Sequence, residues 1–187
     1  MILIIILAVF GASILMFSGW LWGGYNTLVK GGQNIKTMFS NIKTEYQRRA
    51  DLFYNLVEAT KSHAKFEKET LTQVIAMRNG NFGTNQKEAI SKMKGLNSLL
   101  NKLMVVVERY PELRSTEQYK ILMNEVRITE DRINIARTEY NDTVRDYNLY
   151  VRSFPSNLLA GLFNFKEETF FEGESGIDKC PKMDLKI

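Results

Sequence analysis

A seven-residue repeat over residues 119–154 most constrains how this chain can fold. Its apolar and small side chains recur at alternating steps of three and four, which places them along one face of a helix. The members of this heptad stripe are Tyr119, Leu122, Val126, Thr129, Ile133, Ala136, Tyr140, Thr143, Tyr147, Tyr150 and Phe154. Charged residues fall between them, and Pro155 is predicted to end the helix. Such a helix needs partner helices to cover its apolar side.

Residues 35–79 and 90–107 supply these partners. Apolar residues recur every three or four positions in both stretches, from Ile35 to Ile75 and from Ile90 to Val107. A turn-rich loop at 79–85 separates the first two helices, and a short loop after Tyr110-Pro111 joins the next to the heptad helix, with Ser115 and Gln118 as a candidate capping box. The predicted fold class is all-α: a single N-terminal transmembrane helix followed by a long-helix antiparallel bundle, three long helices plus a short fourth.

The first 29 residues contain no charged side chain, so all 25 basic and 21 acidic residues lie in the remainder. Residues 2–22 form a continuous apolar run that is long enough to cross a hydrocarbon core of about 30 Å as a helix. A cleaved signal peptide is the alternative, but no Lys or Arg precedes the run and no small-residue cleavage site follows it. We therefore predict a retained anchor in the lipid bilayer. Its representative residues are Ile2, Leu7, Phe10, Leu15, Trp20 and Trp22.

Basic residues follow the apolar run and none precede it. Lys30, Lys36 and Lys43 lie after the span, so the positive-inside rule places the N-terminus outside and the bundle in the cytoplasm. Gly31-Gly32 is expected to break the helix, with Asn34 as a plausible N-cap for the next one. The predicted organisation is an anchor at 1–29, a glycine hinge at 30–34, a helical bundle at 35–172 and a flexible tail at 173–187.

Residues 156–163 form an uncharged apolar segment with Leu158, Leu159, Leu162 and Phe163 on one face. Its own bundle, the membrane or another protein could cover that face. With the first soluble helix running outward, the next returning and the heptad helix running outward again, the segment should end far from the bilayer. We expect it to dock on the bundle as a short fourth helix with Leu162 buried, which leaves Phe170 and Phe171 exposed for contact.

Residue types that perform chemistry are scarce. His63 is the only histidine, and although Glu67 lies one turn on, Thr60 stands where the Glu of a helix-borne di-iron motif would be. Cys180 is the only cysteine, so no intrachain disulfide forms. The net charge of +4 is modest and its signs alternate, which argues against nucleic-acid binding. We predict no catalytic residue, no metal and no cofactor.

A charged set along the predicted helices has two interpretations. Its members are Arg48, Arg49, Arg132, Arg137, Asp142, Arg145 and Asp146. They either form exposed pairs within and between helices, or fix the register with a partner subunit. The candidate interaction residues are Arg48, Arg49, Arg145, Asp146, Leu158, Leu162, Phe163, Phe170 and Phe171.

Several short motifs occur in order along the chain. They are YNTLV at 25–29, RRADL at 48–52, NLVE at 55–58, AKFEKETL at 64–71, RINIAR at 132–137, YNDTVRDYN at 140–148, RSFPSN at 152–157, AGLF at 160–163 and FFE at 170–172. In these motifs the chain resembles the LemA family. The resemblance implies a prokaryotic protein with one membrane helix and a helical bundle. It implies no reaction, and some relatives are associated with magnetosome membranes, which points to organising or shaping membranes.

Two departures from the family pattern stand out. Phe53-Tyr54 replaces the usual Ile-Pro, and Gly31-Gly32 stands where relatives are more charged. We predict a non-enzymatic, membrane-anchored scaffold that forms a homo-oligomer and holds other membrane proteins or the membrane itself. The alternative is an accessory or regulatory subunit of a membrane protease or signalling complex.

Overall fold

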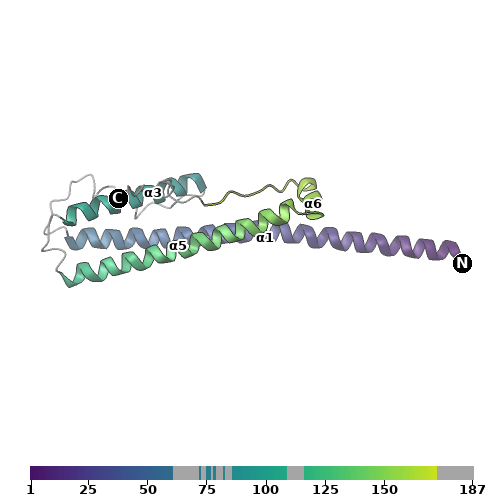
Figure 1. Cartoon of the computed structure of the whole chain (residues 1–187), viewed down its shortest axis with the longest axis horizontal. Helices are drawn as coiled ribbons and strands as arrows, with labels where there is room; N and C mark the ends of the chain where they lie inside the picture. Colours follow the sequence, from purple (N-terminus) through teal and green to yellow (C-terminus); the bar gives the residue numbers. More distant parts are fainter. Residues whose placement is uncertain are drawn as a thin grey trace, which may run out of the picture. The chain divides into compact units, whose positions relative to one another are not determined.

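The computed structural model describes residues 1–60, 72, 75, 76, 78, 82, 86–108 and 116–171. Within these ranges the chain forms four helices and no strand (Figure 1). The helices are α1 (Ile2–Thr60), α3 (Gln86–Glu108), α5 (Glu117–Arg152) and α6 (Ser156–Leu162). The predicted all-α class is confirmed, with three long helices and a short fourth. The expected helix end at residue 79 and the tail at 173–187 lie outside the described residues.

The helices pack as two compact units, which are described separately. The first comprises Met1–Phe39 and Thr138–Phe171, and the second includes Ser40–Arg137. Helices α1 and α5 contribute one part of their length to each unit. The predicted domain boundaries at residues 29, 34 and 172 stay predictions.

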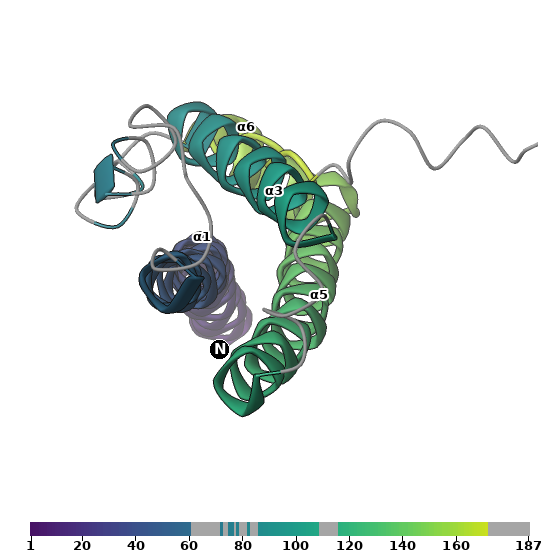
Figure 2. The ribbon, with the colours of Figure 1, turned by 90° about the vertical axis from the view of Figure 1, so that its left-hand side faces the viewer.

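The second unit is a bundle of the end of α1, all of α3 and the start of α5, seen end-on in Figure 2. Its fully covered apolar side chains include Ile42, Tyr46, Phe53, Leu56, Val57, Met93, Leu96, Leu103 and Ile133. Here α1 and α3 share one direction, and α5 runs opposite to both (Figure 1). The predicted heptad stripe of α5 supplies Val126, Thr129 and Ile133 to this core. Burial of these apolar side chains is the main stabilising contribution.

The shared direction of α1 and α3 differs from the expected outward-and-return course. Before α3 begins, Phe82 lies beside Tyr46, with ring centroids 6.1 Å apart. Arg78 comes earlier in the chain than Phe82 but contacts a later part of α1. Its Nε is 3.6 Å from the Asp51 carboxylate, and its guanidinium is 4.2 Å from the centre of the Tyr54 ring. The chain has therefore already returned along α1 when α3 starts. As a consequence α5 is the returning helix, not an outward one.

The expected helix break at Gly31-Gly32 is wrong, because α1 continues through both glycines to Thr60. A glycine inside a helix costs only about 1 kcal/mol relative to alanine. Packing favours it at Gly31, where a Cβ would lie 2.7 Å from Cδ2 of the Tyr147 ring. The glycine therefore allows the two helices of the first unit to approach closely.

Helix α5 begins and ends close to the predicted positions. The backbone N–H of Tyr119 donates to the Thr116 hydroxyl at 3.3 Å, so Thr116 caps the helix where Ser115 had been expected to do so. Ser115 itself lies outside the described residues. The helix ends at Arg152, which leaves Phe154 beyond the stripe and 80 % exposed.

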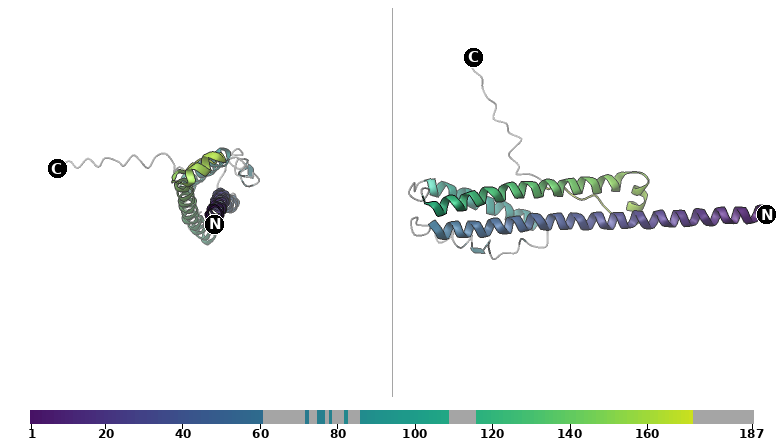
Figure 3. Two further views of the ribbon diagram at one scale, coloured as in Figure 1. Left: turned by 90° about the vertical axis from the view of Figure 1, so that its right-hand side faces the viewer. Right: turned by 90° about the horizontal axis from the view of Figure 1, so that it is seen from below.

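Helix α6 ends in a Schellman motif, which turns the chain sharply. Asn164 has a positive φ of 57°, and its N–H donates to Gly161 while the N–H of Phe165 donates to Ala160. Asparagine tolerates this left-handed conformation better than most residues. The turn sends residues 165–171 back along α5 (Figure 3).

Candidate functional site

The N-terminal part of α1 is apolar and uncovered. An 18-residue window of it has a mean hydropathy of 2.6, and none of that window is buried in the protein. All six predicted anchor residues are exposed: Ile2, Leu7, Phe10, Leu15, Trp20 and Trp22. By length and composition this part of α1 can cross a membrane.

The short helix α6 packs against α1 immediately after that apolar stretch. A Cβ on Gly24 would lie 2.3 Å from Cδ1 of Leu159, so the glycine makes room for the buried leucine. Tyr25 meets the edge of the Phe163 ring, with centroids 4.9 Å apart. The expectation that the end of α5 lies far from the anchor is therefore wrong, because α5 returns along α1.

The covered face of α6 differs from the predicted one. Leu159 and Ala160 are buried, whereas Leu158 and Leu162 point outward and Leu162 is 71 % exposed. The docking of α6 on its own chain agrees with the expectation, but the burial of Leu162 does not. Leu159 is buried in place of Leu162, because its side chain occupies the space left by the absent Cβ of Gly24.

Two asparagines on α5 hold the segment that follows α6. Asn148 accepts from the Glu168 N–H at 2.9 Å and donates to the Glu168 carbonyl at 2.8 Å. Asn141 binds the N–H and carbonyl of Phe171 in the same way, at 2.7 and 3.2 Å. Sequence reasoning missed both, although their seven-residue spacing places them on one helix face.

Phe171 is buried by this arrangement, which corrects its assignment as an exposed contact. The side chain is 6 % exposed and its ring meets Tyr140 edge-on at 6.4 Å. The Tyr140 hydroxyl also donates to the Thr169 carbonyl at 3.0 Å. Phe170 and Phe163 are about half exposed, and their role as contact residues stays a prediction.

A groove lies between α1 and α5 within the first unit. Its volume is about 420 Å³, and its lining residues are Thr27, Lys30, Gly31, Asn34, Thr143, Asp146, Tyr147 and Tyr150. Burial raises the pKa of Tyr147 above its ordinary value, and the negative charge of Glu168 raises it further. The groove holds one cation and one carboxylate, which together are no recognised catalytic set.

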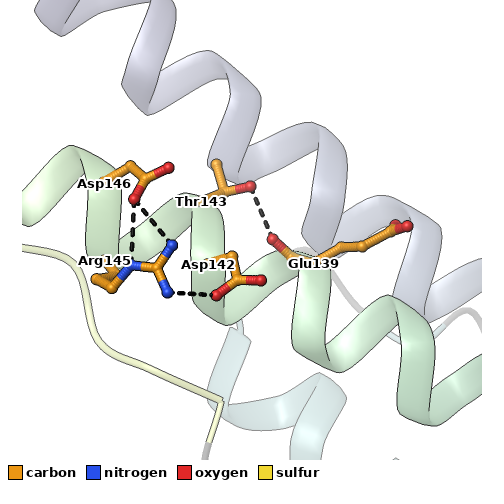
Figure 4. A network of polar contacts seen from close by, with 5 residues as sticks. All are labelled: Glu139, Asp142, Thr143, Arg145 and Asp146. Carbon is orange, nitrogen blue, oxygen red and sulfur yellow. Dashed lines mark hydrogen bonds and ion pairs between the residues drawn. The ribbon is translucent and has the colours of Figure 1, made fainter.

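Arg145 and Asp146 form a charge cluster on the exposed side of α5. The Arg145 guanidinium contacts Asp142 at 2.7 Å and Asp146 at 3.1 Å, while the Thr143 hydroxyl donates to the Glu139 carbonyl (Figure 4). The hydrogen bond to Asp146, followed by the charge of Asp142, raises the pKa of Arg145. Exposed pairs of this kind contribute little stability.

Arg48, Arg49 and Arg137 of the predicted set make contacts between helices of the second unit. Arg48 lies 3.4 Å from Glu125, and both side chains are exposed. Arg49 is buried, donates to Asn97 at 2.9 Å and pairs with Glu130, which corrects its place on an exposed surface. Arg137 donates to the Tyr46 hydroxyl. These contacts match the interpretation as pairs within the chain, and a role in partner register stays a prediction.

In the described part of the chain, no three or more His, Cys, Asp or Glu side chains are grouped to hold a metal ion. His63, Glu67 and Cys180 lie outside it. The described residues thus include an uncovered apolar stretch of α1, an outward face of α6 and several exposed charge pairs. These features define a membrane-associated protein built as a helical bundle.

The chain belongs to the LemA family, which it matches over residues 38–185. It is 30 % identical over 188 residues to magnetosome proteins MamQ 1 and MamQ 2 of Paramagnetospirillum magneticum, covering 86 % of this chain and 69 % of each relative. It is also 29 % identical over 195 residues to magnetosome protein MamQ of Magnetospirillum gryphiswaldense, covering 89 % of this chain and 71 % of that protein. The resemblance read from the short motifs is confirmed.

Proposed function

We propose that this protein is a membrane-anchored scaffold that self-associates through its helical bundle and organises the membrane or proteins beside it. The observation that carries the proposal is a second apolar stripe on α5. Ile121 and Ile135 are more than half exposed and Ile128 is partly exposed, at intervals of seven residues. That interval returns to the same face of a helix, so the three isoleucines share one outer seam, spaced about 10 Å apart along it.

A second copy of the chain is the partner that fits this seam. Asp131 and Arg132 lie within the seam, between Ile128 and Ile135, and their opposite signs allow them to pair with the same residues of a second copy. Anchoring in a bilayer confines the chains to two dimensions and raises their effective concentration. A modest apolar seam then suffices for association. The magnetosome proteins to which the chain is similar make membrane organisation the broader role that we propose.

Light scattering of the full-length protein in mild detergent tests self-association. We expect a homo-oligomer for the wild type and a shift towards monomer for Ile128→Asp combined with Ile135→Asp. Val105→Asp is the matched control, because Val105 is an exposed apolar residue on α3, away from the seam. It should leave the oligomer intact.

Two results would count against the scaffold. A monodisperse wild-type monomer would refute self-association. Recovery of the protein from native membranes in fixed stoichiometry with one enzyme, without self-association, would favour an accessory subunit instead.

A further inference from the structure

The position of α6 is set by contacts to the end of the apolar stretch of α1. Leu159 fills the gap above Gly24, and Tyr25 packs edge-on against both Phe163 and Phe165, with centroids 4.9 and 5.8 Å away. Helix α6 and this part of α1 both belong to the first compact unit. Figure 3 shows α6 turning from the end of α5 towards α1. Helix α6 is therefore held at the level of Gly24 and Tyr25.

That level is where the apolar stretch of α1 meets its first charge. Trp22 is 75 % exposed, Tyr25 is partly exposed, and Lys30 is the first charged side chain of the protein. Tryptophan and tyrosine gather at the boundary between acyl chains and headgroups. If α1 crosses a bilayer, its contacts place α6 at the same boundary.

The outer face of α6 matches that environment. Leu158 and Leu162 lie one turn apart on α6, Phe154 immediately precedes the helix, and each of the three is at least 60 % exposed. No charged side chain occurs between Arg152 and Lys166. A hollow of about 490 Å³ is lined by Ser18, Leu21, Trp22, Tyr25, Asn26 and Phe163, the last of which directly follows α6. A short apolar face beside an apolar hollow is suited to lipid.

We propose that Phe154, Leu158 and Leu162 insert into the headgroup and acyl boundary of the bilayer that α1 crosses, as a second membrane contact. This inference rests on the anchoring part of the proposed function. Amphipathic helices lie in this boundary with their apolar side towards the acyl chains. A second protein copy is the less suitable occupant, because a stable protein interface buries about 800 Å² per partner, more than a seven-residue helix presents.

Site-specific fluorescence in liposomes tests the insertion with the full chain. In a Cys180→Ser background, Leu162→Cys carries an environment-sensitive dye, and the protein is reconstituted in phosphatidylcholine and phosphatidylglycerol vesicles that contain a quencher on the acyl chain. Leu15→Cys is the positive control in the apolar stretch. Leu149→Cys is the matched control, an exposed leucine on α5. Leu158→Cys repeats the measurement at a second position, with folding checked by circular dichroism.

We expect strong quenching at positions 15, 158 and 162, and weak quenching at 149. Quenching at 15 without quenching at 158 and 162 overturns the insertion and leaves the anchor intact. An absence of quenching at 15 overturns the anchor and the inference with it. If the dye at position 162 reports an apolar environment only at a high ratio of protein to lipid, the inference is also overturned, because a second copy of the protein then covers the face.

Discussion

At the scale of single residues, the contact of Gly31 with Tyr147 shows how a small side chain decides packing. The absent Cβ of Gly31 lets the Tyr147 ring approach α1, and that approach buries the ring to 7 % exposure. The buried phenol then lies near the Glu168 carboxylate, so both burial and charge disfavour its anion. The close approach of α1 to the ring thus contributes to the raised pKa of Tyr147.

Tyr147 should make stability depend on alkaline pH. Its pKa is raised in the folded protein, so its contribution is fully present below the unfolded value of about 10 and is lost as pH rises through the folded value. Each unit of difference between the two pKa values is worth about 1.4 kcal/mol of unfolding free energy. Thermal unfolding followed by circular dichroism should show a smaller alkaline loss for Tyr147→Phe than for the wild type.

Glu168→Gln is the companion variant, because it removes the charge and keeps the main-chain contacts of residue 168. It should reduce the alkaline loss in part. An identical alkaline slope for wild type and Tyr147→Phe would show that this phenol does not control it.

At the scale of elements, the segment after α6 is fixed by side chains rather than by helix packing. Each of Asn141 and Asn148 offers one donor and one acceptor to the main chain, as a neighbouring strand would do. The extended segment and α6 are joined through the turn at Asn164. Loosening one therefore loosens the other.

Asn148→Ala should release this segment. The substitution leaves the N–H and carbonyl of Glu168 without their partner, so we expect a loss of about 1–3 kcal/mol of unfolding free energy. Hydrogen exchange at the Glu168 amide should accelerate, and the melting temperature should fall. Asn157→Ala is the control, because Asn157 is exposed on α6 and its side chain holds no part of the segment. Unchanged exchange in Asn148→Ala would refute the role of Asn148.

At the scale of the whole molecule, charge distribution predicts the orientation in the membrane. Lys30, Lys36 and Lys43 follow the apolar run and the N-terminal 29 residues carry no charged side chain, so the bundle is expected in the cytoplasm. Cys180 is the only thiol and provides a clean probe. A membrane-impermeant maleimide should not label it in intact cells, with the outer barrier permeabilised where one exists, and should label it after lysis.

The reciprocal control uses the other end of the chain. Ile2→Cys in a Cys180→Ser background should be labelled in intact cells. Labelling of Cys180 in intact cells, with protection at position 2, would show the opposite orientation.

The amino-acid sequence by itself determined the all-α class, the heptad stripe of α5, the apolar stretch of α1 and the family. These follow from periodicity and composition, which act locally and do not depend on the partner. The approximate bounds of α3 and α5 were also predicted for this reason, because a helix pattern begins and ends with its own capping and breaking residues.

Tertiary structure alone decided which faces meet. From the sequence alone, Gly31 is predicted to break the helix. In the structure α1 continues through it, and the Tyr147 ring packs against the glycine. Leu159 and Leu162 are the same residue type, but only Leu159 is buried, where it packs into the space at Gly24. Phe171 is buried because Asn141, 30 residues earlier in the chain, binds its main chain. Periodicity defines the faces of a helix, whereas the gap or partner that each face meets comes from residues distant in the chain.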